Sequence, residues 1–433
     1  MKSPARAMTA CAVALALVAS TGVLPSCGAP VAMLEPVIVG ALVSDGSSLG
    51  VDGVAWLNAI RLAEREVAAM GGLLGGRPVR VLVVDGELDP DVSVARARRL
   101  VLEEGAVALA GDTYSAGARA VYREVGAPLR VPMVSCCASS TTLTDDVRAQ
   151  SPEDRFFFRV MPPDDMQAFV IADIAREEGM CTRLAIMHVD DDYGAPLSVA
   201  ITAAFEAHGG AVVARVPFDE GRADYASQVA EVAESAPDCV ALIAFPASGG
   251  AILRSWAALP ASSRPERVQW IGADALKTEQ LAVEVVDPAI IDGLLGSVPA
   301  IESPTSPTAA YESFRVAYQA AWDVRPVTFT STYYDSTAVL LLAIELAGDT
   351  DGEAIRDALH RLSDPDGETV DAGDLAEGLR RIRAGERVNY VGASGPVDFD
   401  ELGNVVTDYD VWRYRSGVGF ETIRVVAASQ IVR

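Results

Sequence analysis

Lysine and histidine are the residue types that this chain of 433 residues most nearly lacks. Lysine occurs only at Lys2 and Lys277, and the three histidines, His188, His208 and His360, lie in unrelated contexts. No G-x-x-x-x-G-K-[ST] sequence is present, and the first expected strand–helix turn lacks the G-x-G-x-x-G spacing. The sequence therefore argues against Schiff-base, P-loop and dinucleotide chemistry.

Excess basic charge and long apolar segments beyond the N-terminus are also lacking. The formal net charge is -25, so a basic face that could neutralise phosphates is not expected and nucleic acid is not a predicted partner. The most apolar later segment, residues 338–347, contains Glu345 and is too short to span a bilayer. These features are typical of a soluble extracytoplasmic domain whose molecules repel one another through their shared negative charge.

The N-terminal segment has the pattern of an export signal. Lys2 and Arg6 supply a basic start, and residues 8–23 form an almost unbroken apolar stretch. An apolar run of this length with a basic flank and a small-residue exit predicts a secretory signal rather than a membrane span.

The end of this signal contains a cysteine. Leu24 stands three residues before Cys27 and Ser26 directly before it, which resembles the bacterial lipobox. The resemblance implies that Cys27 is acylated and becomes the new N-terminus after cleavage. The alternative is cleavage by the ordinary signal peptidase, with Cys27 incidental. We expect a signal over residues 1–26 and a tether over 27–36.

The other cysteines match no zinc-binding spacing, so no metal site is predicted. Cys181 precedes an expected strand at 184–189, and Cys239 opens another at 240–245. If these strands are neighbours in one sheet, an oxidising compartment allows a Cys181–Cys239 disulfide. Two buried free thiols are the alternative.

Strand-like and helix-like segments alternate from residue 37 onward. Continuous apolar runs of this length between helices indicate parallel strands buried on both faces. The expected strands are 37–42, 79–84, 106–110 and 131–135, and then 184–189, 211–216, 240–245 and 268–272. The expected helices include 54–69, 90–104, 197–207, 225–235, 308–322, 330–347 and 353–362.

Because the same order occurs twice, the sequence predicts an α/β fold of two doubly wound, Rossmann-like lobes. The short connection at 159–165 and the absence of a Pro/Ser-rich linker favour a multi-strand hinge between the lobes. We expect an N-lobe of about 37–161 plus 299–394 and a C-lobe of about 162–298 plus 395–433. A terminal strand pair is expected within 397–412, with residues 401–404 as its turn.

Two sequence features raise the question of an enzyme or a cation site. Residues 46–50 form a G-x-S-x-G string, but further glycines delay the expected helix, which favours a flexible loop over a nucleophile elbow. Residues 190–192 are three consecutive aspartates without the alternation of an EF-hand, which favours a solvated loop over a cation site. We therefore predict no catalytic residue, metal or cofactor.

Four polar turns follow expected strands, where doubly wound sheets hold their ligands. Each turn alone is explained by helix capping. Together, the first lobe offers hydroxyls and backbone N–H groups that suit a carboxylate, and the second offers carboxylates and a tyrosine that suit an ammonium. The turns are 111–115, 135–144, 190–194 and 272–274. If they face one cleft, their polarity predicts a zwitterionic ligand.

A series of landmarks over nearly the whole chain resembles the type I periplasmic binding proteins, specifically the leucine/isoleucine/valine-binding family. In order they are 70–78, 89–90, 97–101, 135–144, 191–194, 224–225 and 395–400. The resemblance implies the periplasmic binding protein-like I fold.

The resemblance also assigns roles to residues of the expected cleft. Ser115 and Ser139 match hydroxyl residues that hold a ligand carboxylate. The backbone of Cys137 and Ala138 matches a segment of the same site. Two residues of the second lobe also match the family pattern. Tyr193 corresponds to a tyrosine of the cleft, and Asp274 corresponds to the acid that meets the ligand's amino group.

Three positions depart from the family pattern. Where the family often has an aromatic residue in the first loop, this chain offers Leu49 or Asp52. The doublet Cys136-Cys137 replaces small residues or proline, giving either a vicinal disulfide or two pocket-wall thiols. The family's N-lobe disulfide cannot form, because neither Asp89 nor Tyr114 is cysteine. The identity of the ligand is therefore the family property that transfers least well to this chain.

The family mechanism is closure of two lobes about a hinge over the ligand. It implies capture of a small polar solute, most simply an amino acid or related carboxylate or amide, and delivery to the membrane subunits of an ABC transporter. The expected location is the bacterial cell envelope, with a lipid anchor at Cys27. The alternatives are a ligand-sensing or regulatory lipoprotein, a structural lipoprotein whose cleft binds nothing and, last, an enzyme.

Overall fold

The structure is a computed structural model that describes residues 34–43, 51–300 and 308–431. Its first sheet has five parallel strands in the order β2-β1-β3-β4-β5. The strands are β1 (Val37–Leu42), β2 (Val79–Val84), β3 (Ala108–Ala110), β4 (Met133–Ser135) and β5 (Phe157–Arg159). The helices that connect them are α1 (Val51–Ala69), α2 (Pro90–Leu102), α3 (Ser115–Val121), α4 (Ala127–Leu129) and α5 (Thr141–Arg148).

The second sheet has seven strands in the order β15-β14-β10-β9-β8-β6-β7. Strands β6 to β10 are parallel to one another, and β14 and β15 are antiparallel to their neighbours. The strands are β6 (Arg183–Val189), β7 (Ala211–Phe218), β8 (Cys239–Ile243), β9 (Gln269–Gly272), β10 (Leu295–Pro299), β14 (Tyr409–Arg415) and β15 (Gly419–Val426). The helices are α6 (Asp164–Glu177), α7 (Gly194–Ala207), α8 (Ala226–Glu234), α9 (Pro246–Ala258), α10 (Glu279–Glu284) and α15 (Ala428–Ile431).

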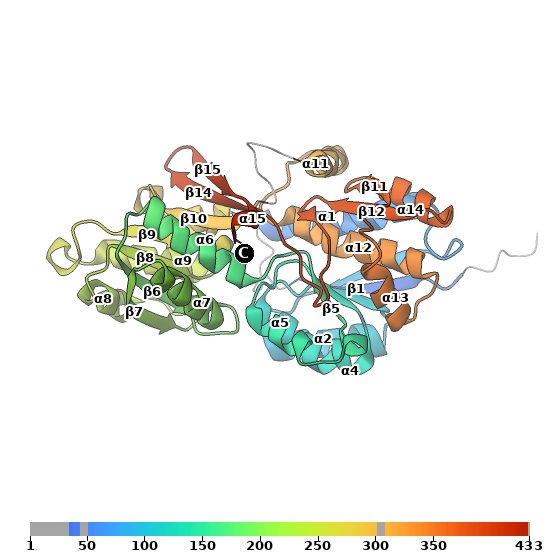
Figure 1. The fold of residues 1–433 in the computed structure, drawn as a ribbon, viewed down its shortest axis with the longest axis horizontal. Coiled ribbons are helices and arrows are strands. Elements are labelled where there is room, and N and C mark those ends of the chain that lie inside the picture. The colour runs from blue at the N-terminus through green and yellow to red at the C-terminus, as the bar shows by residue number, and fades with distance from the viewer. Residues whose placement is uncertain (1–33, 44–50, 301–307, 432–433) are drawn as a thin grey trace, which may run out of the picture. The chain divides into compact units, whose positions relative to one another are not determined.

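A third group of elements lies beside the first sheet (Figure 1). It contains a small sheet in the order β11-β12-β13 and a long helix, α12, that packs against α1. Its strands are β11 (Glu368–Asp371), β12 (Val388–Gly392) and β13 (Gly395–Pro396), and its helices are α11 (Ala309–Trp322), α12 (Thr330–Ala347), α13 (Gly352–Leu359) and α14 (Leu375–Arg383).

The parallel strands form where the sequence has continuous apolar runs, because both faces of each sheet are covered by helices. In β1, all but one residue is buried, and its register pairs Val37 with Val79 on one side and Val39 with Ala108 on the other. Pro90 opens α2 and Asp89 caps it, accepting hydrogen bonds from the N–H groups of Asp91 and Val92. The predicted α/β fold of two doubly wound lobes is confirmed.

The chain passes from one large sheet to the other at several points (Figure 1). It leaves β5 of the first sheet at Arg159 and enters α6 of the second lobe at Asp164. It returns between β10 and α11, and crosses again between β13 and β14. Repeated crossing of the chain between two lobes, the first time over residues 160–163, is typical of a hinge.

The predicted terminal strand pair with a turn at 401–404 is wrong. The hairpin lies further along the chain, between β14 and β15. The 401–404 turn is instead held to the first lobe, because Asn404 Oδ1 accepts a hydrogen bond from Arg159 Nε at 2.9 Å and the Arg159 N–H donates to Gly403 O. Asp400 Oδ1 accepts the N–H groups of Leu402 and Asn404, which closes the turn locally.

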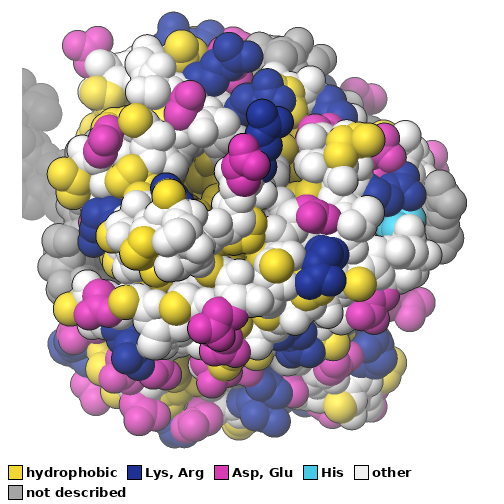
Figure 2. Space-filling model, turned by 90° about the vertical axis from the view of Figure 1, so that its left-hand side faces the viewer, with side chains coloured by type: hydrophobic (Ala, Val, Ile, Leu, Met, Phe, Trp, Pro, Cys, Tyr) yellow, Lys and Arg dark blue, Asp and Glu magenta, His cyan; other side chains and the backbone are white. Residues whose placement is uncertain are grey.

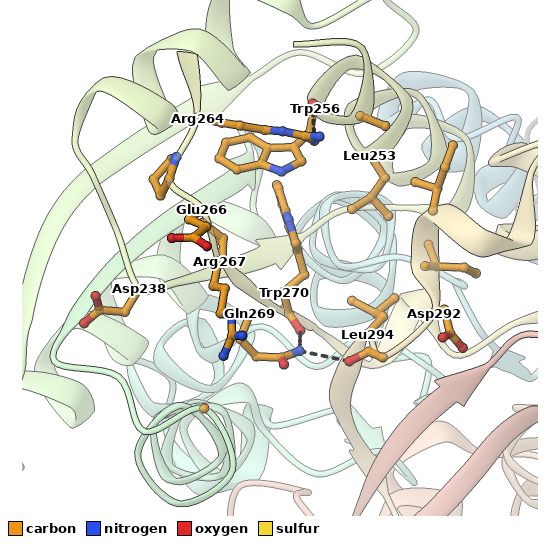
Figure 3. A pocket seen from close by; sticks show the side chains of 17 residues that line it. Asp238, Leu253, Trp256, Arg264, Glu266, Arg267, Gln269, Trp270, Asp292 and Leu294 are labelled. Atoms are coloured by element: carbon orange, nitrogen blue, oxygen red, sulfur yellow. Dashed lines mark hydrogen bonds between the residues drawn. The ribbon is translucent and has the colours of Figure 1, made fainter. Parts of the chain in front are cut away.

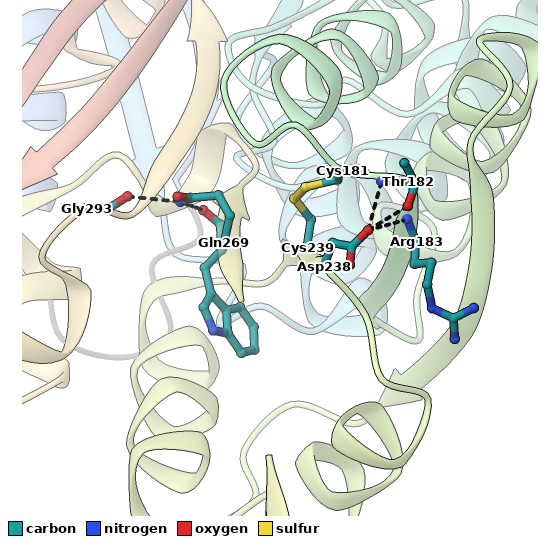
Figure 4. Close-up of a disulfide and its surroundings, with 8 residues drawn as sticks. Cys181, Thr182, Arg183, Asp238, Cys239, Gln269 and Gly293 are labelled. Atoms are coloured by element: carbon teal, nitrogen blue, oxygen red, sulfur yellow. Dashed lines mark hydrogen bonds between the residues drawn. A yellow bond between two sulfur atoms is a disulfide. The ribbon is translucent and has the colours of Figure 1, made fainter. Parts of the chain in front are cut away.

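The structure contains a disulfide between Cys181 and Cys239, with the two Cα atoms 6.0 Å apart (Figure 4). Cys239 opens β8, which pairs with β6 at Leu184, so the bridge ties the starts of two adjacent strands. Next to it, the Asp238 carboxylate accepts the N–H groups of Thr182 and Arg183 and the Thr182 hydroxyl. These donors lower the pKa of Asp238, the Thr182 N–H most of all.

Acidic and basic side chains are interspersed over the face of the molecule in Figure 2. Within the described part of the chain, no helix is both long and apolar enough to cross a bilayer. The same residues contain no group of His, Cys, Asp or Glu side chains that could hold a metal ion. The expected signal, the lipidation site Cys27, the G-x-S-x-G string at 46–50 and Leu49 lie outside the described residues.

Candidate functional site

A cavity of about 100 Å³ lies between the carboxyl ends of strands from the two large sheets. Five of the six predicted ligand residues line it: Ser115, Cys137, Ser139, Tyr193 and Asp274. An engineered cavity of about 150 Å³ holds benzene, so this cavity excludes a peptide and admits a ligand larger than benzene only when the lobes move apart.

The sixth predicted residue, Ala138, does not line the cavity. Its N–H donates to Ser135 Oγ at 3.0 Å and its carbonyl accepts from Arg159 Nη1, so its backbone serves the loop itself. The same loop carries Ser139, whose neighbour Ser140 donates its N–H to Ser115 Oγ at 3.2 Å. This contact fixes Ser115, the first residue of α3, beside the Ser139 segment.

Two aromatic pairs form part of the remaining wall. Trp56 of α1 and Tyr333 of α12 stack with ring centroids 5.0 Å apart and planes inclined by 17°. Tyr193 and Phe245, from the second lobe, lie with centroids 5.8 Å apart. Trp56, Tyr333 and Phe245 were not predicted, because they meet only through the tertiary fold.

Among the described residues that line the cavity, Asp274 is the acidic one, and it is 5% exposed. The Tyr193 hydroxyl donates to its Oδ1 at 2.7 Å. Gln167 Nε2 donates to the same oxygen at 3.1 Å when its amide is oriented to satisfy both its oxygen and its nitrogen. Burial raises the pKa of Asp274, and these hydrogen bonds oppose the rise.

The cysteine doublet forms no vicinal disulfide: both thiols are free. Cys137 lies within 3.7 Å of Thr332 Oγ1 at the cavity wall. Cys136 is buried beneath it, and burial raises the pKa of its thiol. The vicinal disulfide is therefore wrong, and of the two thiols only Cys137 lines the cavity.

A wider groove of about 680 Å³ lies elsewhere in the second lobe and contains none of the predicted ligand residues (Figure 3). It runs past Asp238, Gln269 and Leu294, at the amino ends of β8, β9 and β10. Trp256 and Trp270 meet edge to face there, with centroids 5.3 Å apart. Since doubly wound sheets bind ligands at the carboxyl ends of their strands, the smaller cavity is the candidate site.

Comparison with known proteins identifies the family of the chain. Residues 36–406 match the family described as periplasmic binding protein. The chemotactic signal transduction substrate-binding protein BasB of Halobacterium salinarum is 28% identical over 90% of this chain and 89% of its own length.

Two solved structures share the fold. A branched-chain amino acid transporter substrate-binding protein of Streptococcus pneumoniae, in complex with isoleucine, has a TM-score of 0.72 at 18% identity, covering 91% of this chain and 99% of its own. A solute-binding protein of an ABC transporter from Rhodopseudomonas palustris, in complex with 3,4-dihydroxybenzoic acid, has a TM-score of 0.70 at 18% identity, covering 91% and 98%.

The family match spans most of the chain, and the two lobes with a cavity between them are the architecture that the sequence resemblance implied. The chain belongs to the type I periplasmic binding proteins.

Proposed function

We propose that this protein captures an α-amino acid with an apolar or aromatic side chain between its lobes and delivers it to the membrane subunits of an ABC transporter. The observation that supports this ligand is the buried pair of Tyr193 and Asp274 opposite the hydroxyls of Ser115 and Ser139. In this proposal the hydroxyls hold the carboxylate and Asp274 holds the ammonium.

The aromatic walls favour an apolar side chain over a charged one. Trp56 with Tyr333 on one side, and Tyr193 with Phe245 on the other, offer flat apolar surfaces to a small ligand. A dihydroxybenzoate ligand, as in the Rhodopseudomonas protein, has no cation for Asp274. Asp274 already accepts hydrogen bonds from Tyr193 and Gln167, and a ligand ammonium would add an opposite charge that a simple acid cannot offer, which favours an amino acid.

The decisive experiment compares an amino acid with the same molecule lacking its amino group. A thermal-shift screen of amino acids, amides and small carboxylates finds binders, and calorimetry then compares L-phenylalanine with 3-phenylpropanoate. We expect Asp274→Asn to weaken L-phenylalanine binding by about 100-fold or more, since loss of one partner of a buried ion pair costs about 3–5 kcal/mol. Binding of 3-phenylpropanoate is expected to be unchanged or tighter.

The control is Asp190→Asn, which removes one negative charge from an exposed residue after β6. It is expected to change neither affinity. Equal losses for both probes in Asp274→Asn would remove the ammonium role, and a screen without any binder would favour a structural lipoprotein.

Sensing is a second candidate function, because the BasB relative belongs to a chemotactic signal transduction system. Uptake of labelled amino acid separates the two: transport requires the protein for uptake, whereas sensing leaves uptake intact when its gene is deleted.

We also propose that Cys27 is the lipid attachment site, on the evidence of the sequence motif. Cys27→Ala is expected to abolish incorporation of labelled palmitate and to release the protein from membranes. Retention of the label in this variant would contradict lipidation at Cys27.

A further inference from the structure

A second acidic residue, Asp164, lies beside the candidate site. It opens α6 directly after the chain crosses from β5, and it is only 1% exposed. Its N–H donates to the carbonyl of Ser139, a cavity residue, at 2.9 Å. Among the described residues, neither of its carboxyl oxygens has a hydrogen-bond partner. The next residue, Asp165, is exposed.

The first turn of α6 connects this acid to the other side of the cavity. Gln167 lies one turn after Asp164, donates to Asp274 Oδ1 and accepts the Asp274 N–H at 3.0 Å. One helical turn therefore contacts Ser139 through its first residue and Asp274 through its fourth. Asp164 and Asp274 are close enough that the negative charge of Asp274 raises the pKa of Asp164.

The two acids differ in the donors that face them. Asp274 accepts hydrogen bonds from Tyr193 and Gln167, which stabilise its charged form. Asp164 accepts no hydrogen bond of ordinary geometry, although the Ser139 hydroxyl is near enough to favour its charged form, and an ionised buried carboxylate with so few donors is costly. Burial and the charge of Asp274 raise the pKa of Asp164 well above its ordinary value, against the opposing effects of the Ser139 hydroxyl and Arg159.

The nearby cation does not pair with Asp164. Arg159 is fully buried, and its guanidinium donates to four oxygens of uncharged groups: Ala138 O, Ser140 O, Thr144 Oγ1 and Asn404 Oδ1. The titratable and charged groups around Asp164 are Asp165 on its own helix, Arg159 on β5, Asp274 after β9, Tyr193 before α7 and Tyr409 on β14.

We propose that Asp164 is a second acid of the ligand site and gives up its proton when the ammonium of a ligand binds beside Asp274. This inference rests on the proposed function. In the free protein the proton is on the Asp164 carboxyl. When the ammonium enters, that O–H bond breaks, the proton passes to solvent, and the carboxylate balances the added positive charge. A ligand without an amino group brings no charge and releases no proton.

The test is calorimetry of L-phenylalanine and 3-phenylpropanoate in buffers of different ionisation enthalpy, which measures protons exchanged on binding. We expect wild-type protein to release up to about one proton with L-phenylalanine and none with 3-phenylpropanoate. By linkage, a reaction that releases a proton becomes more favourable as pH rises, so L-phenylalanine affinity is expected to increase by up to about tenfold per pH unit.

Asp164→Asn keeps the backbone contact to Ser139 and is expected to abolish both the proton release and the pH dependence. The exposed neighbour provides the matched control, since Asp165→Asn is expected to retain both. Infrared difference spectra of the wild type, which need no variant, are expected to lose one protonated-carboxyl band when L-phenylalanine is added.

Binding of L-phenylalanine without proton release, or with an unchanged carboxyl band, overturns this inference and leaves the proposed function standing. Proton release that persists in a folded Asp164→Asn protein overturns it as well. If the wild type binds another amino acid from the screen instead, that amino acid and its analogue without the amino group replace the two probes. Failure to bind any amino acid of the screen contradicts the proposed function, and this inference falls with it.

Discussion

Tyr193 offers the cavity two chemically different surfaces. Its ring packs against Phe245, and its hydroxyl donates to Asp274 Oδ1 at 2.7 Å. Removing the hydroxyl alone separates these contributions. A hydrogen bond to a charged group contributes about 1.5–3 kcal/mol, so Tyr193→Phe is expected to weaken L-phenylalanine binding by about 10- to 100-fold in calorimetry.

The same variant keeps the ring and is therefore expected to bind 3-phenylpropanoate as the wild type does. Tyr225→Phe is a suitable control, because its hydroxyl donates to Asp219 O away from the cavity. If Tyr193→Phe weakened both probes alike, its role would be packing alone.

The residues that could be predicted for this site share one property: they follow strand ends in the sequence. Ser115, Ser139 and Asp274 stand in polar turns after β3, β4 and β9, so their meeting follows from sheet geometry. Trp56 and Tyr333 stand inside helices, where an aromatic residue is most simply a core residue. One signal was available in the sequence, since α12 begins with the polar and aromatic run Thr330-Ser331-Thr332-Tyr333-Tyr334. The structure buries all five of these residues.

At the scale of elements, three helices of the first lobe meet at one carboxylate. Glu66 of α1 accepts a hydrogen bond from the Tyr334 hydroxyl of α12 at 2.6 Å and from the Leu375 N–H at the start of α14. Burial raises the pKa of Glu66 from 4.5 to about 7. The folded protein therefore holds this proton more tightly than the unfolded chain does.

The sign of the pH effect follows from this difference. The contribution of Glu66 to stability is complete below about pH 4.5 and is lost as pH rises through about 7. Between about pH 5 and about pH 8, the wild type is expected to lose up to about 3 kcal/mol relative to Glu66→Gln, less where solvent reaches the half-buried side chain.

Denaturant unfolding at the two pH values measures this difference. Glu103→Gln, at an exposed acid that follows α2, is the control and is expected to parallel the wild type. A Glu66→Gln protein whose stability changed with pH as the wild type does would contradict the assignment.

The bounds of some elements could be predicted from their own sequence, whereas the place of one turn could not. The bounds of β1, β2 and α12 match the predicted ranges, because long apolar runs and clear breaks set them locally. The 401–404 turn looked like a hairpin, but contacts from Arg159, about 240 residues earlier in the chain, decide its place. Local turn chemistry does not contain that information.

At the scale of the whole molecule, an ion pair joins the lobes beside the cavity. Arg119 Nη1 of α3 lies 2.7 Å from Asp192 Oδ1, which follows β6, while its Nε lies 2.7 Å from Asp146 Oδ2 of its own lobe. The bond to Asp146 stays within one lobe whatever the hinge does. The bond to Asp192 exists only while the lobes are together, so it favours the closed arrangement.

Asp192→Asn removes this attraction without touching the residues that line the cavity. The pair is partly exposed, and such pairs contribute about 0.2–1 kcal/mol, so a smaller closed population is expected to weaken L-phenylalanine binding by about 1.4- to fivefold. Added salt screens the pair and should shrink the difference from wild type. Small-angle scattering of the unliganded proteins should show a larger radius of gyration for the variant. Asp190→Asn removes the same charge two residues earlier, where no described residue forms a salt bridge with it, and is expected to change neither quantity. Identical behaviour of the two variants would mean that net charge, rather than the Arg119 contact, sets the balance between open and closed lobes.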